Sequence, residues 1–202
     1  MSTVIDPELR RRNFRTVLLL AGLFMLPLLL SFWLYYGWHW RPEGMTNHGE
    51  LIQPLRPLPQ LALRDAAGVT QSHIFQGHWT LVYVGDGGCD VDCRTTLIFM
   101  RQTRLSLNNE MTRVQRVFLA TAHCCDRAYL AAVHPGLSAL DASQADAQPL
   151  LAQFSAAGPA GRSRELYIVD PLGNLMMRYD ARLPPQGLLE DLKRLLQLSH
   201  IG

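Results

Sequence analysis

The stretch Trp79–Cys93, WTLVYVGDGGCDVDC, decides the fold of this chain. Its first six residues form a continuous apolar run with β-branched and aromatic side chains, the pattern of a strand buried on both faces. A glycine-rich turn follows and places Cys89 and Cys93 where the next helix is expected to begin. In α/β folds, chemistry is found in this position beyond the carboxyl end of a strand.

The rest of the sequence continues an alternation of strands and helices. An edge hairpin is expected upstream at 60–65 and 69–75, and further strands at 113–121, 165–170 and 175–179. Helices are expected from Cys93 to about Leu107, at 128–133, at 148–156 and from Pro184 or Pro185 onward. This order predicts an α/β fold, a mixed sheet flanked by helices on both faces, which is the thioredoxin-like topology.

An uncharged apolar segment lies near the N-terminus. Val17–Trp38 has 22 residues, which at about 1.5 Å each span the hydrocarbon core of a bilayer. The segment is too long for the apolar region of a cleaved signal peptide. Four arginines at positions 10, 11, 12 and 15 precede it, so the positive-inside rule places the N-terminus in the cytoplasm.

The sequence therefore predicts four parts. These are a cytoplasmic tail at 1–13, a transmembrane helix at 14–40, an extended proline-containing tether at 41–59 and a periplasmic thioredoxin-like domain at 60–202. In this interpretation residues 14–40 contact the lipid bilayer, and the protein crosses a bacterial inner membrane once.

Composition and charge exclude several classes of protein. With 48% hydrophobic and 18% charged residues, the chain is neither disordered nor collagen-like. The net charge of +2 comes from the arginines before the apolar segment, and the remainder is neutral. A nucleic-acid partner is not expected, because no basic face is available for the phosphate backbone.

Cys89 and Cys93 can support two kinds of chemistry. One helical turn would bring their side chains to the same side, which suits a redox disulfide or two thiolates around Cu(I). A purely structural disulfide is the alternative in an oxidising compartment. The helix N-terminus favours a thiolate, whereas neighbouring carboxylates such as Asp90 and Asp92 raise the pKa of a thiol. We therefore do not expect a strongly oxidising pair.

His123, Cys124 and Cys125 follow the strand at 113–121. If this strand lies parallel to WTLVYV, both strands end at the same edge of the sheet. The three residues would then approach the first cysteine pair, giving a mixed thiolate and imidazole site with auxiliary thiols. Alternatively, the cysteines pack as small apolar side chains, or a disulfide joins the two loops. A bond between adjacent cysteines is not expected.

Several motifs together resemble the Sco/SenC family, of which this chain looks like a divergent member. They are the single N-terminal anchor, the C-x-x-x-C after WTLVYVG, the FLAT strand, HPGLSALDAS at 134–143 and YIVDPLGNLMMRY at 167–179. The family consists of membrane-anchored thioredoxin-fold proteins of cytochrome c oxidase assembly. The resemblance implies copper delivery to the dinuclear copper site of the oxidase, or reduction of the cysteines of that site. It also implies an oxidase subunit or another assembly factor as partner.

The sequence departs from the Sco/SenC pattern at two places. Arg94 stands where the family has a proline after the second cysteine, and 161–164 contains no histidine where the family has its third copper ligand. The two cysteine ligands carry over to Cys89 and Cys93. Cu(I) bound by two soft thiolates is compatible with these residues, and His123 is a candidate substitute ligand.

The leading functional hypothesis is an accessory factor for respiratory oxidase assembly that acts through copper or thiol chemistry at Cys89 and Cys93. We expect this factor to be a metallochaperone rather than an enzyme with turnover. One alternative is a membrane-tethered thiol–disulfide oxidoreductase. Another is a non-catalytic scaffold or oxidase-associated subunit, which the missing proline and histidine favour.

Overall fold

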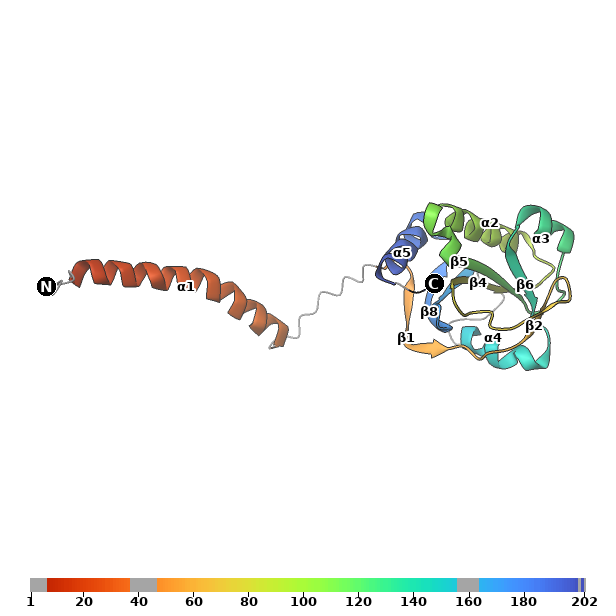
Figure 1. Cartoon of the computed structure of the whole chain (residues 1–202), viewed down its shortest axis with the longest axis horizontal. Coiled ribbons are helices and arrows are strands. Elements are labelled where there is room, and N and C mark those ends of the chain that lie inside the picture. Colours follow the sequence, from red (N-terminus) through yellow and green to blue (C-terminus); the bar gives the residue numbers. More distant parts are fainter. Residues whose placement is uncertain (1–6, 37–46, 156–163, 200, 202) are drawn as a thin grey trace. The chain divides into compact units, whose positions relative to one another are not determined.

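The computed structural model describes residues 7–36, 47–155, 164–199 and 201, and the chain divides into two units, Met1–Met45 and Thr46–Gly202. In the first unit helix α1 runs from Pro7 to Tyr36 (Figure 1). Its part Arg11–Trp33 has a mean hydropathy of 2.2 and is long and apolar enough to cross a membrane. The helix begins before residue 14 because the residues ahead of the apolar run are also good helix formers. Residues 37–40 of the expected span lie outside the described residues.

The second unit is built on one mixed sheet. Among the described residues its strand order is β1-β8-β7-β4-β5-β6-β2-β3. The pairs β4–β5 and β5–β6 are parallel and the other pairs are antiparallel. The strands are β1 (Glu50–Pro57), β2 (Leu63–Asp65), β3 (Thr70–Gln71), β4 (Trp79–Gly85), β5 (Val114–Ala120), β6 (Leu137–Asp141), β7 (Glu165–Val169) and β8 (Asn174–Asp180).

Helices cover both faces of the sheet, as Figure 1 shows. The described helices of this unit are α2 (Val91–Leu105), α3 (Arg127–Val133), α4 (Gln148–Ser155) and α5 (Pro185–Leu198), with 3₁₀ turns at Asn108–Arg113 and Ala145–Ala147. Buried side chains of α2, α3 and α5 share one core cluster, and those of α4 belong to the other. The expected thioredoxin-like architecture is confirmed.

Strand β4 lies in the middle of this arrangement, and all seven of its residues are buried. Leu81 and Tyr83 belong to the core beneath α2 and α5, whereas Val82 and Val84 belong to the core beside α4. Burial of each large apolar side chain stabilises the fold by about 1.5–3 kcal/mol. The strand is thereby fixed from both sides, and so is the point at which the cysteine loop leaves it.

Residues 50–57 correct the predicted tether. They form edge strand β1, which pairs with β8. Asp191 of α5 anchors the two residues directly before this strand, because its carboxylate accepts hydrogen bonds from the amides of His48 and Gly49. Extended, proline-containing backbone is equally compatible with an edge strand, so local pattern alone does not separate it from a tether. Residues 41–46 of the predicted tether lie outside the described residues.

The other elements follow the expected order, with two differences. Strand β6 was not expected, because LSALD has no β-branched residues, yet it pairs in parallel with β5. Helix α2 begins at Val91 instead of Cys93, because Asp90 caps it and accepts a hydrogen bond from the amide of Cys93 at 2.9 Å. Cys93 therefore lies within the first turn of α2.

Candidate functional site

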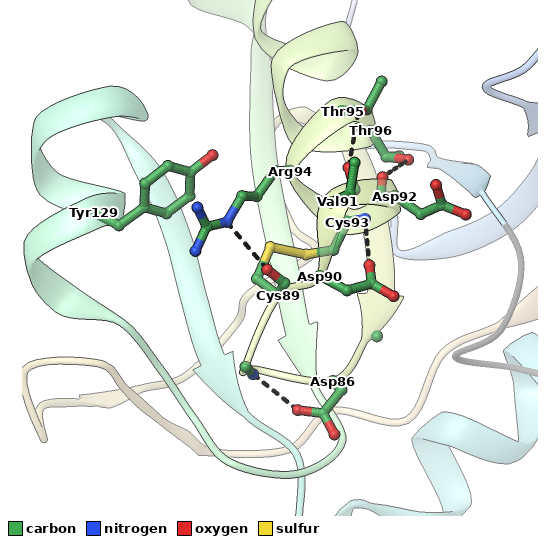
Figure 2. Close-up of a disulfide and its surroundings, with 12 residues drawn as sticks. Asp86, Cys89, Asp90, Val91, Asp92, Cys93, Arg94, Thr95, Thr96 and Tyr129 are labelled. Carbon is green, nitrogen blue, oxygen red and sulfur yellow. Dashed lines mark hydrogen bonds between the residues drawn. A yellow bond between two sulfur atoms is a disulfide. The ribbon is translucent and has the colours of Figure 1, made fainter.

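The loop between β4 and α2 is shaped by two aspartates. Asp86 accepts a hydrogen bond from the amide of Gly88 at 2.8 Å, and Asp90 caps α2. Between them Cys89 has a left-handed backbone with φ of 45°, which turns the chain from strand to helix. Figure 2 shows the result: Cys89 and the first turn of α2 face each other across the turn.

Cys89 and Cys93 form a disulfide, with their Cα atoms 5.0 Å apart. Both residues belong to the core cluster beneath α2 and α5, and they are only 4% and 2% exposed. The pair therefore lies at the predicted position but below the surface. In this oxidised form neither sulfur is a thiolate, so a metal ion could bind only after two-electron reduction of the bridge.

Arg94 replaces the proline of the Sco/SenC pattern and connects the cysteine loop to α3. Its Nε donates a hydrogen bond to the carbonyl oxygen of Cys89 at 3.2 Å. Its guanidinium carbon lies 4.7 Å from the centre of the Tyr129 ring, a cation–π contact (Figure 2). A proline in this place has no N–H groups and could make neither contact. Sequence reasoning identified the departure at Arg94 but not its partners.

Two of the acidic groups near the pair have partners that lower their pKa values. Hydrogen bonds from the Gly88 amide and from His123 hold the pKa of Asp86 below its usual value. Arg164, at the start of β7, forms an ion pair with Asp92 in the first turn of α2, and this hydrogen bond lowers the pKa of Asp92. The lowered pKa values keep both carboxylates ionised, so Asp86 still acts to raise a thiol pKa, whereas the charge of Asp92 is offset by the Arg164 cation.

His123 faces Asp86, with 3.1 Å between its Nδ1 and the nearer carboxylate oxygen, and its side chain is 79% exposed. Across the described ranges, no three or more His, Cys, Asp or Glu side chains gather as a metal-binding group. Of the neighbourhood 161–164, where the Sco/SenC pattern has its histidine, only Arg164 is described. Within the described ranges the two sulfurs of Cys89 and Cys93 are the candidate donors for a soft metal ion, and in reduced form they would fit the low coordination of Cu(I).

Cys124 and Cys125 form a disulfide with each other, across a cis peptide bond. This corrects both alternatives from the sequence, separate packing and a bond between the loops. The two residues are half-buried and pack against the core cluster that contains Cys89 and Cys93. The predicted meeting of the two loops at one edge is confirmed, since β4 and β5 are parallel neighbours and the amide of Gly87 donates to the carbonyl oxygen of Ala122.

The family model described as "transmembrane-like, thioredoxin-like, C-terminal domain" matches residues 79–199. A search of curated proteins gave no match. Among solved structures, apo Sco1 from Thermus thermophilus is 21% identical, with 76% of this chain and 99% of that chain covered and a TM-score of 0.58. Copper-bound ScoI from Bradyrhizobium japonicum is 18% identical, with 68% and 98% covered and a TM-score of 0.55.

Copper-bound yeast Sco1 is 15% identical, with 72% of this chain and 95% of that chain covered and a TM-score of 0.61. At these identities the likeness is one of fold: the second unit of this chain has the architecture of Sco proteins over nearly their whole length. The matched residues 79–199 include both cysteine pairs and Arg164.

Proposed function

This chain belongs to the transmembrane-like, thioredoxin-like C-terminal domain family, and from that premise we propose that it is a membrane-anchored, Sco-type accessory factor of respiratory cytochrome c oxidase assembly. Its chemistry in this proposal is thiol–disulfide exchange at Cys89 and Cys93. The observation that carries the proposal is the disulfide between the end of a central strand and the first turn of a helix. The carboxyl end of a central strand is where α/β folds place their chemistry, and this position supports a redox role for the bridge.

The exchange step needs only the two cysteines and a client disulfide. In the reduced protein, one thiolate attacks a client sulfur, and the client's second sulfur leaves as a thiolate. The remaining cysteine then attacks the mixed disulfide, closes the Cys89–Cys93 bond and releases the reduced client. Two electrons pass to the client in this sequence. The N-terminus of α2 stabilises the Cys93 thiolate through its amide dipoles.

Copper handling is the second candidate, and it uses the same two residues. Structures of Sco proteins from Bradyrhizobium japonicum and yeast are described as having copper bound. In this chain the reduced pair would hold Cu(I) as cargo between two thiolates, for transfer to the dinuclear copper site of the oxidase. An oxidase subunit or another assembly factor is the proposed partner for either reaction.

The proposed location follows from the anchor. The positive-inside rule, applied to the arginines before the apolar run, supports a cytoplasmic N-terminus, so the domain would lie in the periplasm, where disulfides persist. Added protease should cleave the domain in spheroplasts without lysis. Protection of the domain until the membrane is broken would reverse this orientation.

A redox titration of the full chain in detergent tests the chemistry. Alkylation and mass spectrometry should detect reduction of Cys89–Cys93 at a potential between about −180 and −270 mV, the range of the less oxidising thiol oxidoreductases. A bridge that stays closed below about −300 mV would be structural and would refute the redox proposal. Under anaerobic conditions the reduced chain should bind one Cu(I), and the Cys89→Ser/Cys93→Ser variant should not.

Complementation of a deletion strain tests the oxidase connection. The Cys89→Ser/Cys93→Ser variant should fail to restore oxidase activity and oxidase copper content. The exposed Ser72→Ala variant is the control and should restore both. If the Cys89→Ser/Cys93→Ser variant fully restores oxidase activity, and this activity is lost only on deletion of the domain, the result would support the scaffold alternative instead.

A further inference from the structure

The disulfide Cys124–Cys125 lies on the loop that meets the first cysteine loop. Strands β4 and β5 run in parallel to their ends, with Gly85 opposite Ala120. Beyond that point the two chains stay bonded, since the amide of Thr121 donates to the carbonyl oxygen of Gly85 at 2.8 Å and that of Gly87 donates to Ala122 at 2.7 Å. Two disulfides therefore lie on directly joined loops.

The contact between these loops leaves no space for a side chain. A Cβ atom on Gly87 would lie 2.6 Å from the carbonyl oxygen of His123 and 2.7 Å from the Cα of Cys124. The backbone of the first loop thus touches the backbone of the second loop at Cys124 itself. Both disulfides also pack on the same apolar cluster.

The two disulfides differ in their accessibility. Cys89 and Cys93 are 4% and 2% exposed, whereas Cys124 and Cys125 are half-buried. Arg94 crosses from the buried pair to the ring of Tyr129 on α3, as Figure 2 shows. An incoming protein thiolate consequently meets the sulfurs of the second loop more easily than those of the first.

We propose that Cys124–Cys125 is a second redox-active disulfide, which accepts two electrons from a dithiol protein and passes them to the buried Cys89–Cys93 bridge. The inference rests on the proposed redox function of Cys89 and Cys93 and supplies the route by which that pair is reduced. In this proposal the external electron donor is a protein whose two thiols lie on an exposed loop.

The electrons balance over two exchanges. A thiolate of the donor attacks one sulfur of Cys124–Cys125, the other sulfur leaves as a thiolate, and the donor's second thiol closes the donor disulfide. One thiolate of the new dithiol then attacks Cys89 and expels the Cys93 thiolate, which is the better leaving group because it lies in the first turn of α2. Closure of Cys124–Cys125 releases Cys89 as a thiol.

A comparison of two reductants tests the relay in the full chain in detergent. The Cys124→Ser/Cys125→Ser variant removes the outer pair, and dithiothreitol and a reduced thioredoxin are the small and large donors. We expect the large donor to reduce Cys89–Cys93 at least about tenfold more slowly in this variant than in the wild type, because the intramolecular step is lost. Dithiothreitol should reduce both proteins at similar rates. Equal rates with thioredoxin would overturn the relay.

The same experiment separates failure of the relay from failure of the proposed function. If dithiothreitol cannot open Cys89–Cys93 even in the variant, the redox function itself fails. The Cys89→Ser/Cys93→Ser variant then reports the outer pair alone, and a Cys124–Cys125 bridge that thioredoxin cannot open would overturn the relay independently. Circular dichroism should show that each variant is folded. Any variant that unfolds is replaced by the corresponding Cys→Ala version.

A trapped intermediate provides the second test. In Cys93→Ser/Cys125→Ser and Cys93→Ser/Cys124→Ser, Cys89 remains with one cysteine of the outer pair. In a glutathione buffer at least one of these variants should form the disulfide between the loops, identified by peptide mass. Glutathione adducts on both cysteines without any bond between the loops would contradict direct exchange.

Discussion

The contact at Gly87 leads to a sharp prediction for Gly87→Ala. The added methyl group would lie 2.6 Å from the carbonyl oxygen of His123 and 2.7 Å from both the carbonyl oxygen of Ala122 and the Cα of Cys124. Ordinary contact begins at 3.4 Å, so the two loops must separate by about 0.7–0.8 Å. All three neighbours are backbone atoms, which cannot rotate away as a flexible side chain would.

The expected cost of this separation is about 1–3 kcal/mol in the free energy of unfolding, typical of overpacking at a site that cannot relax. For a domain of this size such a loss lowers the melting temperature by about 3–10 °C. The same displacement stretches the hydrogen bond from the Gly87 amide to Ala122, which is 2.7 Å long. We therefore also expect slower exchange between the two cysteine pairs.

Gly88→Ala is the matched control, because its Cβ would approach only the side-chain oxygen of Asp86, at 3.3 Å. Thermal and urea unfolding of the full chain, followed by near-ultraviolet circular dichroism, should show Gly88→Ala within about 1 kcal/mol of the wild type. If Gly87→Ala is as stable as Gly88→Ala, the two loops are not in contact at this point and the reasoning is refuted.

Three further predictions concern buried polar groups of the domain. Asp191→Ala should lower the free energy of unfolding by about 1–3 kcal/mol, because the amides of His48 and Gly49 lose their acceptor. Asp191→Asn should retain part of this stability, and equal denaturation midpoints for the two variants would contradict the role of Asp191 as acceptor. Burial lowers the pKa of His134 below 6.5, so the unfolded chain binds the proton more readily and stability should fall as the pH drops below about 6.5. Urea titrations between pH 7 and 5 should show a smaller decline for His134→Gln, and an identical decline would exclude the histidine as the cause. Burial also lowers the pKa of Arg116 to about 10; its Nη2 donates a hydrogen bond to the carbonyl oxygen of Pro135 at 2.7 Å, but its Nε and Nη1 have no hydrogen-bond partner among the described residues. The desolvation cost of the two unpaired groups should offset this bond, so Arg116→Met should change the free energy of thermal unfolding by less than about 1 kcal/mol; a loss above about 2 kcal/mol would show that the bond to Pro135 outweighs that cost.

The position of the first cysteine pair could be predicted because it depends on strong local patterns. A continuous run such as WTLVYV, rich in β-branched and aromatic residues, is typical of a strand at the centre of a sheet, and the strand at 114–120 is also largely buried. A right-handed crossover then brings the ends of both strands to one edge. The meeting of the two cysteine loops follows from these rules without knowledge of any side-chain contact.

The remaining features depend on partners that are distant in the sequence. The contact of Arg94 with Tyr129 and the ion pair of Arg164 with Asp92 join separate elements, and no periodicity signals either of them. The bond between Cys124 and Cys125 was not expected, since sequence alone does not determine which cysteines pair. Strand β1 was predicted as tether because pairing with β8 is set by the sheet and not by local composition.

The two edges of the sheet have a consequence for how this protein meets other chains. Strand β3 has only two residues, and β1 contains Pro54 and Pro57 and has a register irregularity between Leu51 and Arg56. Short, proline-containing or irregular edge strands are poor templates for a further strand. The domain is thus protected against edge-to-edge aggregation at high local concentration. Among the described strands neither edge suits a partner that binds by β-augmentation, so we expect recognition to use side chains on loops and helices.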